Sequence, residues 1–371
     1  MELYSYQLKA LEWLEQKKSG LLFMDAGTGK SFVVLTYCKR SNFKSILIFC
    51  PKTAKKNWVN EIKKSGCDEN YFTIETYTSL LTKQASRLLK EWDCIIADEC
   101  QRVSHWSSKT TKRFHKLSAR NRVALSGTPW KNKIWEAHSV LHWIQPQCLG
   151  KNWWDFRTRF LIFSPYIQGQ IIGVRDEQVI KKVIDCLSYR VFRDQEDVQD
   201  SIHLPKLITT EKRFDLKNFE LNNLYEIKND ALLTIQENKK LMMSNILVSL
   251  TRMRQCVDDP ISIELDRVGT KEHVLCTILK DKKSTLIYSP FSSTMKRLAC
   301  KYGGLLLTGE NSEDERNNAI KIFQQGINDT LFITSAGGEA INLTKADRVI
   351  FYALPYTWAD VDQVTSRAHR N

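Results

Sequence analysis

The chain lacks C-x-x-C pairs, long apolar runs, tandem repeats and low-complexity segments. Its ten cysteines are scattered, which argues against a zinc ribbon and against a disulfide framework. No apolar run reaches the ~20 residues that a membrane-spanning helix needs. The first residues have neither a basic segment nor an apolar core, so no secretory signal is expected. We therefore expect an intracellular protein with no membrane association, in the cytoplasm or nucleoid or in a virus-infected host cell.

Glycine and proline are also scarce, with 15 and 8 residues among 371, whereas 42% of residues are hydrophobic. This composition excludes collagen and wholesale disorder, and the length suggests two or three domains. Positive charge predominates, because 55 Lys and Arg residues face 42 Asp and Glu residues, a formal net charge of +13. An excess of this sign favours a polyanionic partner.

Two sets of short, continuous apolar runs predict buried parallel strands that alternate with helices. The first set is residues 20–24, 45–50, 94–97 and 122–126, and the second is 285–289, 304–308, 330–334 and 348–352. Between the sets, aromatic and basic residues recur at helical spacing. The predicted fold is therefore α/β, with two parallel-sheet lobes and helical insertions between them.

The segment from Gly20 to Ser31 predicts a phosphate-binding loop. An apolar strand leads into Gly27-Thr28-Gly29-Lys30-Ser31 and then into a helix, whose N-terminal N–H groups favour an anion. Lys30 would reach the β- and γ-phosphates of a nucleotide, and the Ser31 hydroxyl would bind Mg²⁺. Met24 stands where the general motif has glycine, and a plain tight turn is the alternative interpretation.

A second apolar run ends in two carboxylates, Asp98 and Glu99. At the end of a parallel strand beside the phosphate-loop strand, Asp98 is expected to bind Mg²⁺ and Glu99 to polarise the attacking water. A solvated acidic turn is the alternative. The two sites together predict an ATP hydrolase.

Further segments occur in a recognisable order along the whole chain. They are residues 3–8, 46–58, 125–129, 204–206, 250–260, 285–289, 307–316, 335–343 and 363–370, and they include Asn57-Trp58, Arg193, Gln101, Asp259 and His369. In this order they resemble the motifs of SWI/SNF-type DNA translocases of helicase superfamily 2, in a minimal bacterial or viral form. Gln101 and Asp259 stand where that family usually has His, and the chain ends at Asn371, directly after the last motif.

The resemblance implies two RecA-like lobes and assigns roles to residues in them. Its nucleotide contacts correspond to Tyr6, Gln7, Gly338 and Glu339, its catalytic arginines to Arg367 and Arg370, and its nucleic-acid contacts to Lys52, Thr53 and Ser335. Arg367 and Arg370 are three residues apart and would share one helix face. An arginine at this place stabilises charge on the transferring phosphoryl group. Two solvated arginines at a frayed end are the alternative.

Residues 102–133 carry nine Lys and Arg residues and no acid. Lys112, Arg113 and Lys116 are the candidates for phosphate contacts with nucleic acid, which would be independent of sequence. A solvated basic face is the equally weighted alternative. Five tryptophans crowd residues 130–154, where core packing is expected and base stacking is the alternative.

These observations predict a first lobe over residues 1–206, with a helical insertion at about 135–200. The second lobe, residues 207–371, would have an insertion at about 215–265 and an end that is cut short or minimal. We expect a monomeric, DNA-dependent ATPase that translocates along double-stranded DNA, with ATP and Mg²⁺ in the cleft between the lobes. The alternatives are a strand-separating or branch-migrating helicase and a nucleic-acid-binding module whose ATPase is silent.

Overall fold

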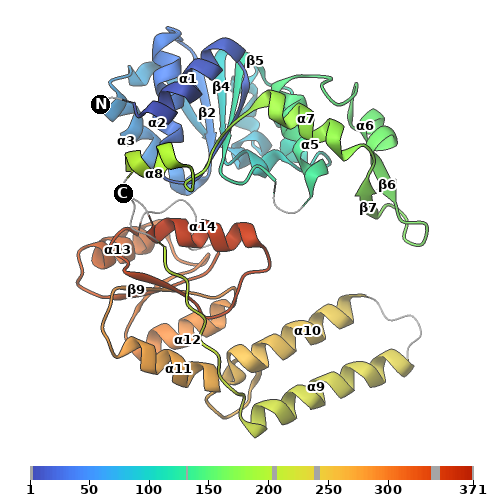
Figure 1. Ribbon diagram of the computed structural model, residues 1–371, viewed down its shortest axis with the longest axis vertical. Coiled ribbons are helices and arrows are strands. Elements are labelled where there is room, and N and C mark those ends of the chain that lie inside the picture. Colours follow the sequence, from blue (N-terminus) through green and yellow to red (C-terminus); the bar gives the residue numbers. More distant parts are fainter. Residues whose placement is uncertain (1–2, 131–132, 203–206, 238–242, 336–342, 370–371) are drawn as a thin grey trace. The chain divides into compact units, whose positions relative to one another are not determined.

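The computed structural model describes residues 3–130, 133–202, 207–237, 243–335 and 343–369. The described residues divide into two compact units, one up to residue 202 and the other from residue 207 onwards. Each unit contains a parallel sheet with helices on both faces (Figure 1). This arrangement confirms the predicted α/β class with two parallel-sheet lobes.

The first unit contains a six-stranded parallel sheet in the order β3-β2-β4-β5-β1-β8. Its strands are β1 (Gly20–Met24), β2 (Ile46–Cys50), β3 (Phe72–Thr76), β4 (Glu91–Asp98), β5 (Ser118–Ser126) and β8 (Ser188–Val191). Strand β2 shows why they form, because all five of its residues are buried, as expected for a strand that is covered on both faces. The sequence runs did not predict β3 and β8, the two edge strands.

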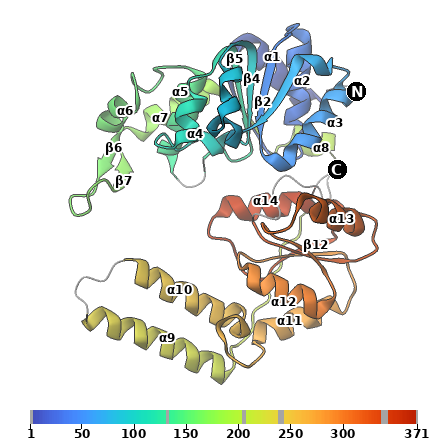
Figure 2. The same cartoon turned by 180° about the vertical axis from the view of Figure 1, so that it is seen from behind.

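Helices cover both faces of this sheet, with α1, α2 and α3 together on one face (Figure 2). The helices of the unit are α1 (Ser5–Lys17), α2 (Lys30–Arg40), α3 (Lys55–Ser65), α4 (Lys109–Phe114), α5 (Ala137–Ile144), α6 (Trp153–Phe160), α7 (Glu177–Leu187) and α8 (Glu196–Ile202). On the other face, residues of α4 and α5 pack against the sheet in one core that includes Phe49, Phe114 and Trp143.

The predicted insertion at about 135–200 contains strands as well as helices. An antiparallel hairpin, β6 (Leu161–Phe163) and β7 (Ile171–Val174), follows α6, and β8 returns the chain to the main sheet. A separate small core joins Leu141, Phe156 and Ile184 from α5, α6 and α7. The insertion predicted as helical therefore contains helices and also one strand pair, because two short apolar runs pair with each other.

The second unit contains a four-stranded parallel sheet in the order β10-β11-β9-β12. The strands are β9 (Thr285–Tyr288), β10 (Leu305–Leu307), β11 (Thr330–Ile333) and β12 (Arg348–Phe351). The helices are α9 (Asn218–Glu237), α10 (Met243–Asp258), α11 (Thr270–Leu279), α12 (Ser292–Tyr302), α13 (Glu313–Gln324) and α14 (Trp358–Ala368). Helices α11 and α12 cover one face, and α13 and α14 cover the other (Figure 1).

Helices α9 and α10 lie side by side and project from this unit. Buried ion pairs attach the end of α10 to the neighbouring helices. Arg297 of α12 contacts Asp259 at 2.7 Å and Glu272 of α11 at 2.6 Å, and Lys271 of α11 pairs with Asp258. Asp259, which replaces the usual His of the resembled motif, thus anchors the projecting helices through an arginine.

Candidate nucleotide-binding site

Strand β1 runs into a loop, Asp25 to Gly29, and then into α2, which is the predicted strand–loop–helix geometry. Gly27 and Gly29 have φ values of 85° and 81°, in the left-handed region that glycine adopts most readily. The buried Thr28 closes the loop, since its hydroxyl donates to the Asp25 carbonyl oxygen at 2.7 Å. The loop therefore presents the N-terminus of α2, as an anion site requires.

Lys30 begins α2, and its ammonium group folds back over the loop. Its Nζ donates to the carbonyl oxygens of Met24 at 2.8 Å and Asp25 at 3.2 Å. Ser31 follows in the first turn of the helix and is partly buried. The positive charge thus stands directly over the loop where the nucleotide phosphates are predicted.

The first turn of α1 supports the same loop. The side chains of Tyr6 and Gln7 are both buried and both donate to the carbonyl oxygen of Thr28, at 3.1 and 3.0 Å. Gln7 Oε1 also accepts the backbone N–H of Tyr4 at 3.0 Å. Burial raises the pKa of Tyr6 to about 12, so its hydroxyl remains a hydrogen-bond donor at neutral pH. The structure therefore places both predicted nucleotide-binding residues against the phosphate loop.

The two carboxylates lie at the carboxyl end of β4. The sequence predicted that this strand would lie beside β1. This prediction is wrong, because β5 lies between them and pairs with both. Burial and the charge of Glu99 raise the pKa of Asp98 to about 6, whereas hydrogen bonding from Trp58 and the charge of Lys30 oppose this shift. Both segments follow the carboxyl ends of strands that pair with β5, in which Ser126 lies opposite Phe23 and Leu125 lies opposite Asp98, so the loop and the carboxylates lie at the same end of the sheet.

Glu99 has a left-handed backbone, with φ 53° and ψ 54°. A non-glycine residue in this region is uncommon, and such strain is concentrated at functional sites. The conformation starts a turn in which Gln101 Nε2 donates to Glu99 Oε2 at 2.8 Å. Ser126, at the end of β5, donates to Gln101 Oε1 at 2.9 Å and accepts the backbone N–H of Thr128 at 2.9 Å. Gln101 therefore links the predicted catalytic carboxylate to the segment after β5.

Three residues of this site belong to the motif-like segments of the sequence, although the sequence did not predict them as site residues. Gln101 is one, and Trp58 is another, since its indole Nε1 donates to Asp98 Oδ2 at 2.9 Å. The third is Arg193, whose backbone N–H donates to Asp25 Oδ2 at 2.9 Å and whose Nε donates to the Ala26 carbonyl oxygen at 2.8 Å. Their motif positions were the available signal, but only the fold shows what they contact.

The residues fit a magnesium ion shared with a nucleotide. Burial and the neighbouring Glu99 carboxylate both raise the pKa of Asp98, and a bound cation would stabilise its ionised form against both effects. Asp98 and Ser31 supply the oxygen ligands that Mg²⁺ prefers, and two ligands suffice when phosphates and water complete the shell. Among the described residues, no three His, Cys, Asp or Glu side chains form a cluster that could hold a metal ion alone.

The candidate nucleic-acid contacts have different surroundings. Lys52 is exposed, whereas the Thr53 hydroxyl is buried and has no hydrogen-bond partner among the described residues. Lys112 and Lys116 are exposed near the end of α4. Arg113 is exposed as well, but its Nη1 donates to the Leu80 carbonyl oxygen at 2.6 Å, which gives it a structural role.

In the second unit, Ser335 is exposed and its hydroxyl lies 2.6 Å from the Tyr288 hydroxyl. Arg367 is buried on α14, and its carbonyl oxygen accepts the backbone N–H of Leu343 at 2.9 Å. The predicted contacts Gly338, Glu339 and Arg370 lie outside the described residues.

The tryptophans after β5 mostly pack, as expected. Trp143 is buried in the main core, Trp130 packs against it, and Trp135 and Trp153 pack against the smaller core of the insertion. Trp154 differs, because 66% of its surface is exposed.

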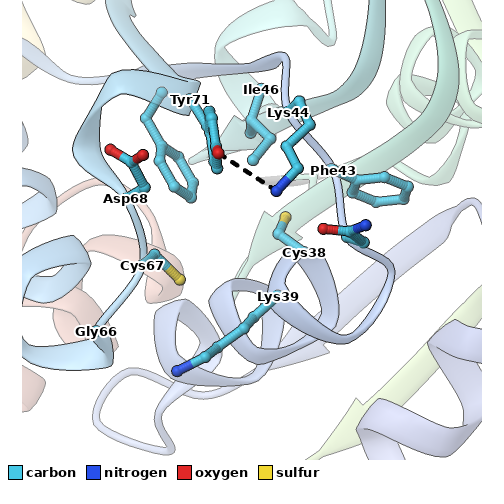
Figure 3. Close-up of a pocket in the computed structure, with 11 residues that line it drawn as sticks. Cys38, Lys39, Phe43, Lys44, Ile46, Gly66, Cys67, Asp68 and Tyr71 are labelled. Carbon is cyan, nitrogen blue, oxygen red and sulfur yellow. Dashed lines mark hydrogen bonds between the residues drawn. The ribbon is translucent and has the colours of Figure 1, made fainter.

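A surface pocket, whose lining is drawn in Figure 3, lies at the amino ends of two strands of the sheet. Its lining includes Ile46 and Phe72, the first residues of β2 and β3. Lys44 Nζ donates to the Tyr71 hydroxyl at 3.3 Å and lies 4.4 Å from the ring centre. Because ligands of open α/β sheets bind at the carboxyl ends of strands, this pocket is not the nucleotide site.

Comparisons with known proteins match both units. The family model for the SNF2-related domain matches residues 67–262, and the model for the helicase conserved C-terminal domain matches residues 270–371. No helix among the described residues is both long and apolar enough to cross a membrane.

Among curated proteins, YwqA of Bacillus subtilis, provisionally named an ATP-dependent helicase/translocase, is 26% identical over 98% of this chain and 44% of its own length. The human SWI/SNF-related matrix-associated actin-dependent regulator of chromatin subfamily A member 1 is 25% identical over 99% of this chain and 40% of its own length. The chain thus spans less than half of these relatives. A solved SWI2/SNF2 ATPase core of Sulfolobus solfataricus, in complex with dsDNA, is 23% identical with a TM-score of 0.49, over 95% of this chain and 82% of that one.

The SNF2-related match alone covers more than half of the 371 residues. It confirms the family resemblance predicted from the sequence, and the chain belongs to the SNF2-related family.

Proposed function

We propose that this chain is a DNA-dependent ATPase that translocates along double-stranded DNA as a monomer. The observation that carries the proposal is the hydrogen-bonded site in the first unit, in which Lys30 covers the phosphate loop and Gln101 joins Glu99 to Ser126. Family membership and the names of its relatives support ATP use. The preference for duplex DNA rests on the resemblance of the motifs.

In this proposal Lys30 and the N–H groups of the loop bind the β- and γ-phosphates. Ser31 and Asp98 hold Mg²⁺, which neutralises charge on the phosphates when it is bound. Glu99 accepts a proton from the attacking water, and Gln101 holds the Glu99 carboxylate in place. Gln7 and Tyr6 bind the adenine side of the nucleotide.

The second unit would complete the site when ATP binds. Arg367 and Arg370 would stabilise charge on the transferring phosphoryl group, and Gly338 and Glu339 would contact the nucleotide. Closure of the two units around ATP, followed by opening after hydrolysis, would then move the protein along the DNA backbone. The exposed residues Lys52, Lys112, Lys116 and Ser335 would contact phosphates without reading bases, and Thr53 would do so once DNA binding exposes its buried hydroxyl.

The test measures phosphate release with no nucleic acid, with duplex DNA and with single-stranded RNA of equal length. We expect duplex DNA to stimulate hydrolysis most. We expect Lys30→Ala to abolish hydrolysis while duplex binding, measured by fluorescence anisotropy, remains. Hydrolysis by a folded Lys30→Ala protein would contradict the phosphate-loop assignment.

Two further assays separate translocation from the alternatives. Displacement of a third strand from a DNA triplex, without unwinding of a partial duplex, supports translocation along duplex DNA. Unwinding of the partial duplex would instead identify a strand-separating helicase. A protein that binds DNA but releases no phosphate would be a binding module with a silent ATPase.

A further inference from the structure

Trp58 makes a contact that the proposed function does not use. It lies on α3 with only 2% of its surface exposed, and its indole Nε1 donates to Asp98 Oδ2 at 2.9 Å. The backbone of Asp98 is held as well, because the Tyr77 hydroxyl donates to the Asp98 carbonyl oxygen at 2.8 Å. Strand β4, Tyr77 and Trp58 together determine where the Asp98 carboxylate points.

The indole is suited to orient a metal-binding carboxylate. It is a neutral donor that binds one carboxylate oxygen, so it restrains the orientation of the group without neutralising its charge. A lysine or arginine in its place would compete with a cation for the same negative charge. Hydrogen-bond partners of metal ligands typically change metal affinity or activity by about 10–100-fold when they are removed.

The position of Trp58 on α3 also connects two predicted sites. Helix α3 begins at Lys55, directly after a short 3-10 turn, Lys52–Ala54, that contains the candidate nucleic-acid contacts Lys52 and Thr53. Trp58 lies about one helical turn after Lys55, so a displacement of this end of α3 would move the indole with it. The hydrogen bond to Asp98 would then transmit the displacement to the carboxylate.

We propose that Trp58 is a positioning residue that orients Asp98 for a divalent cation and couples this cation site to nucleic-acid binding at Lys52 and Thr53. The first part concerns only the chain's affinity for Mg²⁺ with nucleotide. The second part rests on the proposed function, since it requires that the chain bind duplex DNA.

The first experiment compares Trp58→Phe with Trp92→Phe. Trp92 is a matched control, because it is also buried, its indole Nε1 also donates one hydrogen bond (to the Leu88 carbonyl oxygen at 3.0 Å), and it lies near the start of the strand that ends in Asp98. The probe is a fluorescent ADP analogue whose binding is titrated with Mg²⁺ and is also measured in EDTA.

We expect Trp58→Phe to raise, by about tenfold or more, the Mg²⁺ concentration at which the increase in analogue binding is half-maximal. Analogue binding in EDTA should stay within about twofold of the parent, and Trp92→Phe should change neither quantity. An equal Mg²⁺ response in the two variants would overturn the positioning role. If Trp58→Phe weakens binding in EDTA as well, or does not fold, 3-benzothienylalanine at position 58 replaces it, because this residue keeps the ring shape and lacks the N–H. A parental Mg²⁺ response with that residue would also overturn the proposal.

The second experiment measures the affinity of each protein for duplex DNA under two conditions. In one, Mg²⁺ and a non-hydrolysable ATP analogue are both present at concentrations that saturate that protein, and in the other both are absent. Coupling is reciprocal, so a change in DNA affinity with nucleotide reports the effect of DNA on the nucleotide site. We expect the ratio of the DNA affinity with Mg²⁺ and analogue to the DNA affinity without them to move towards one in Trp58→Phe. The DNA affinity without nucleotide should equal that of the parent. A ratio equal to the parental one overturns the coupling. If the parent binds no duplex, the proposed function fails, whereas the result of the Mg²⁺ titration stands by itself.

Discussion

Replacing Gly29 with alanine tests whether the phosphate loop and the start of α1 form one unit. Gly29 has φ +81°, and a Cβ added to it would lie 2.3 Å from Nε2 of Gln7. The amide of Gln7 is buried and hydrogen-bonded at both ends, to Thr28 and to Tyr4. It therefore cannot move aside without losing these contacts.

The expected destabilisation has two parts. A left-handed backbone costs an alanine about 1–2 kcal/mol relative to its preferred conformations. Displacement of Gln7 removes two hydrogen bonds, each of which contributes about 0.5–1.5 kcal/mol. The free energy of unfolding of the first unit should therefore fall by about 2–5 kcal/mol.

Gly66→Ala is the matched control. Gly66 also has a positive φ, +64°, but a Cβ there would meet only Lys39 Nζ, at an ordinary distance of 3.6 Å. The control should therefore lose only the backbone part, about 1–2 kcal/mol. Nine of the ten tryptophans lie in the first unit, so tryptophan fluorescence during urea denaturation reports on this unit in both variants.

We expect Gly29→Ala to lose more stability than Gly66→Ala and to bind an ATP analogue at least about tenfold more weakly, because the loop and Gln7 both shift. Gly66→Ala should bind the analogue as the parent does. Equal stability in the two variants, together with parental nucleotide binding by Gly29→Ala, would refute the argument that Gln7 supports the loop.

Three further predictions concern the carboxylate, the buried histidines and the basic face. Glu99→Gln should bind ATP but hydrolyse it at least about 100-fold more slowly than the parent, because the side chain can no longer accept a proton while the other contacts remain. Single-turnover measurements of hydrolysis check this, and a rate equal to that of the parent would exclude Glu99 as the base. Burial lowers the pKa of His138 to about 3 and that of His115 to about 4 in the folded protein, whereas histidine in an unfolded chain has a pKa near 6.5. As the pH falls, the unfolded state therefore binds protons first. The free energy of unfolding should decrease as the pH drops from about 6.5 to 4. His138→Leu should reduce this pH dependence without a large loss of stability at pH 7, since neither ring nitrogen of His138 has a hydrogen-bond partner among the described residues. Urea denaturation at pH 7 and pH 5 measures both effects, and a pH dependence equal to that of the parent would contradict the prediction. Replacing Lys112 and Lys116 together with alanine should flatten the slope of log K against log [salt] for duplex DNA by up to about 1.8, at about 0.9 per phosphate contact, and an unchanged slope would identify a solvated face.

Much of the α/β framework could be predicted from local sequence patterns. All eight predicted apolar runs form strands, because burial on both faces requires continuous apolar residues that are visible in the sequence. Strand β3, Phe-Thr-Ile-Glu-Thr, was missed since only Glu75 of its five residues is fully buried. Strand β8, Ser-Tyr-Arg-Val, is equally polar, and only pairing with β1 defines it as a strand.

The candidate site divides in the same way. Glycine at a positive φ, a lysine at a helix start and acids after a strand are local features, so the sequence alone determined Gly29, Lys30, Asp98 and Glu99 as candidates. The order of the strands, with β5 between β1 and β4, follows from long-range pairing, which no local pattern records. The hydrogen bond from Trp58 to Asp98 joins residues 40 positions apart, and the one from Arg193 to Asp25 joins residues 168 positions apart. Only tertiary packing decides such contacts, because each depends on where two separate segments of the chain meet.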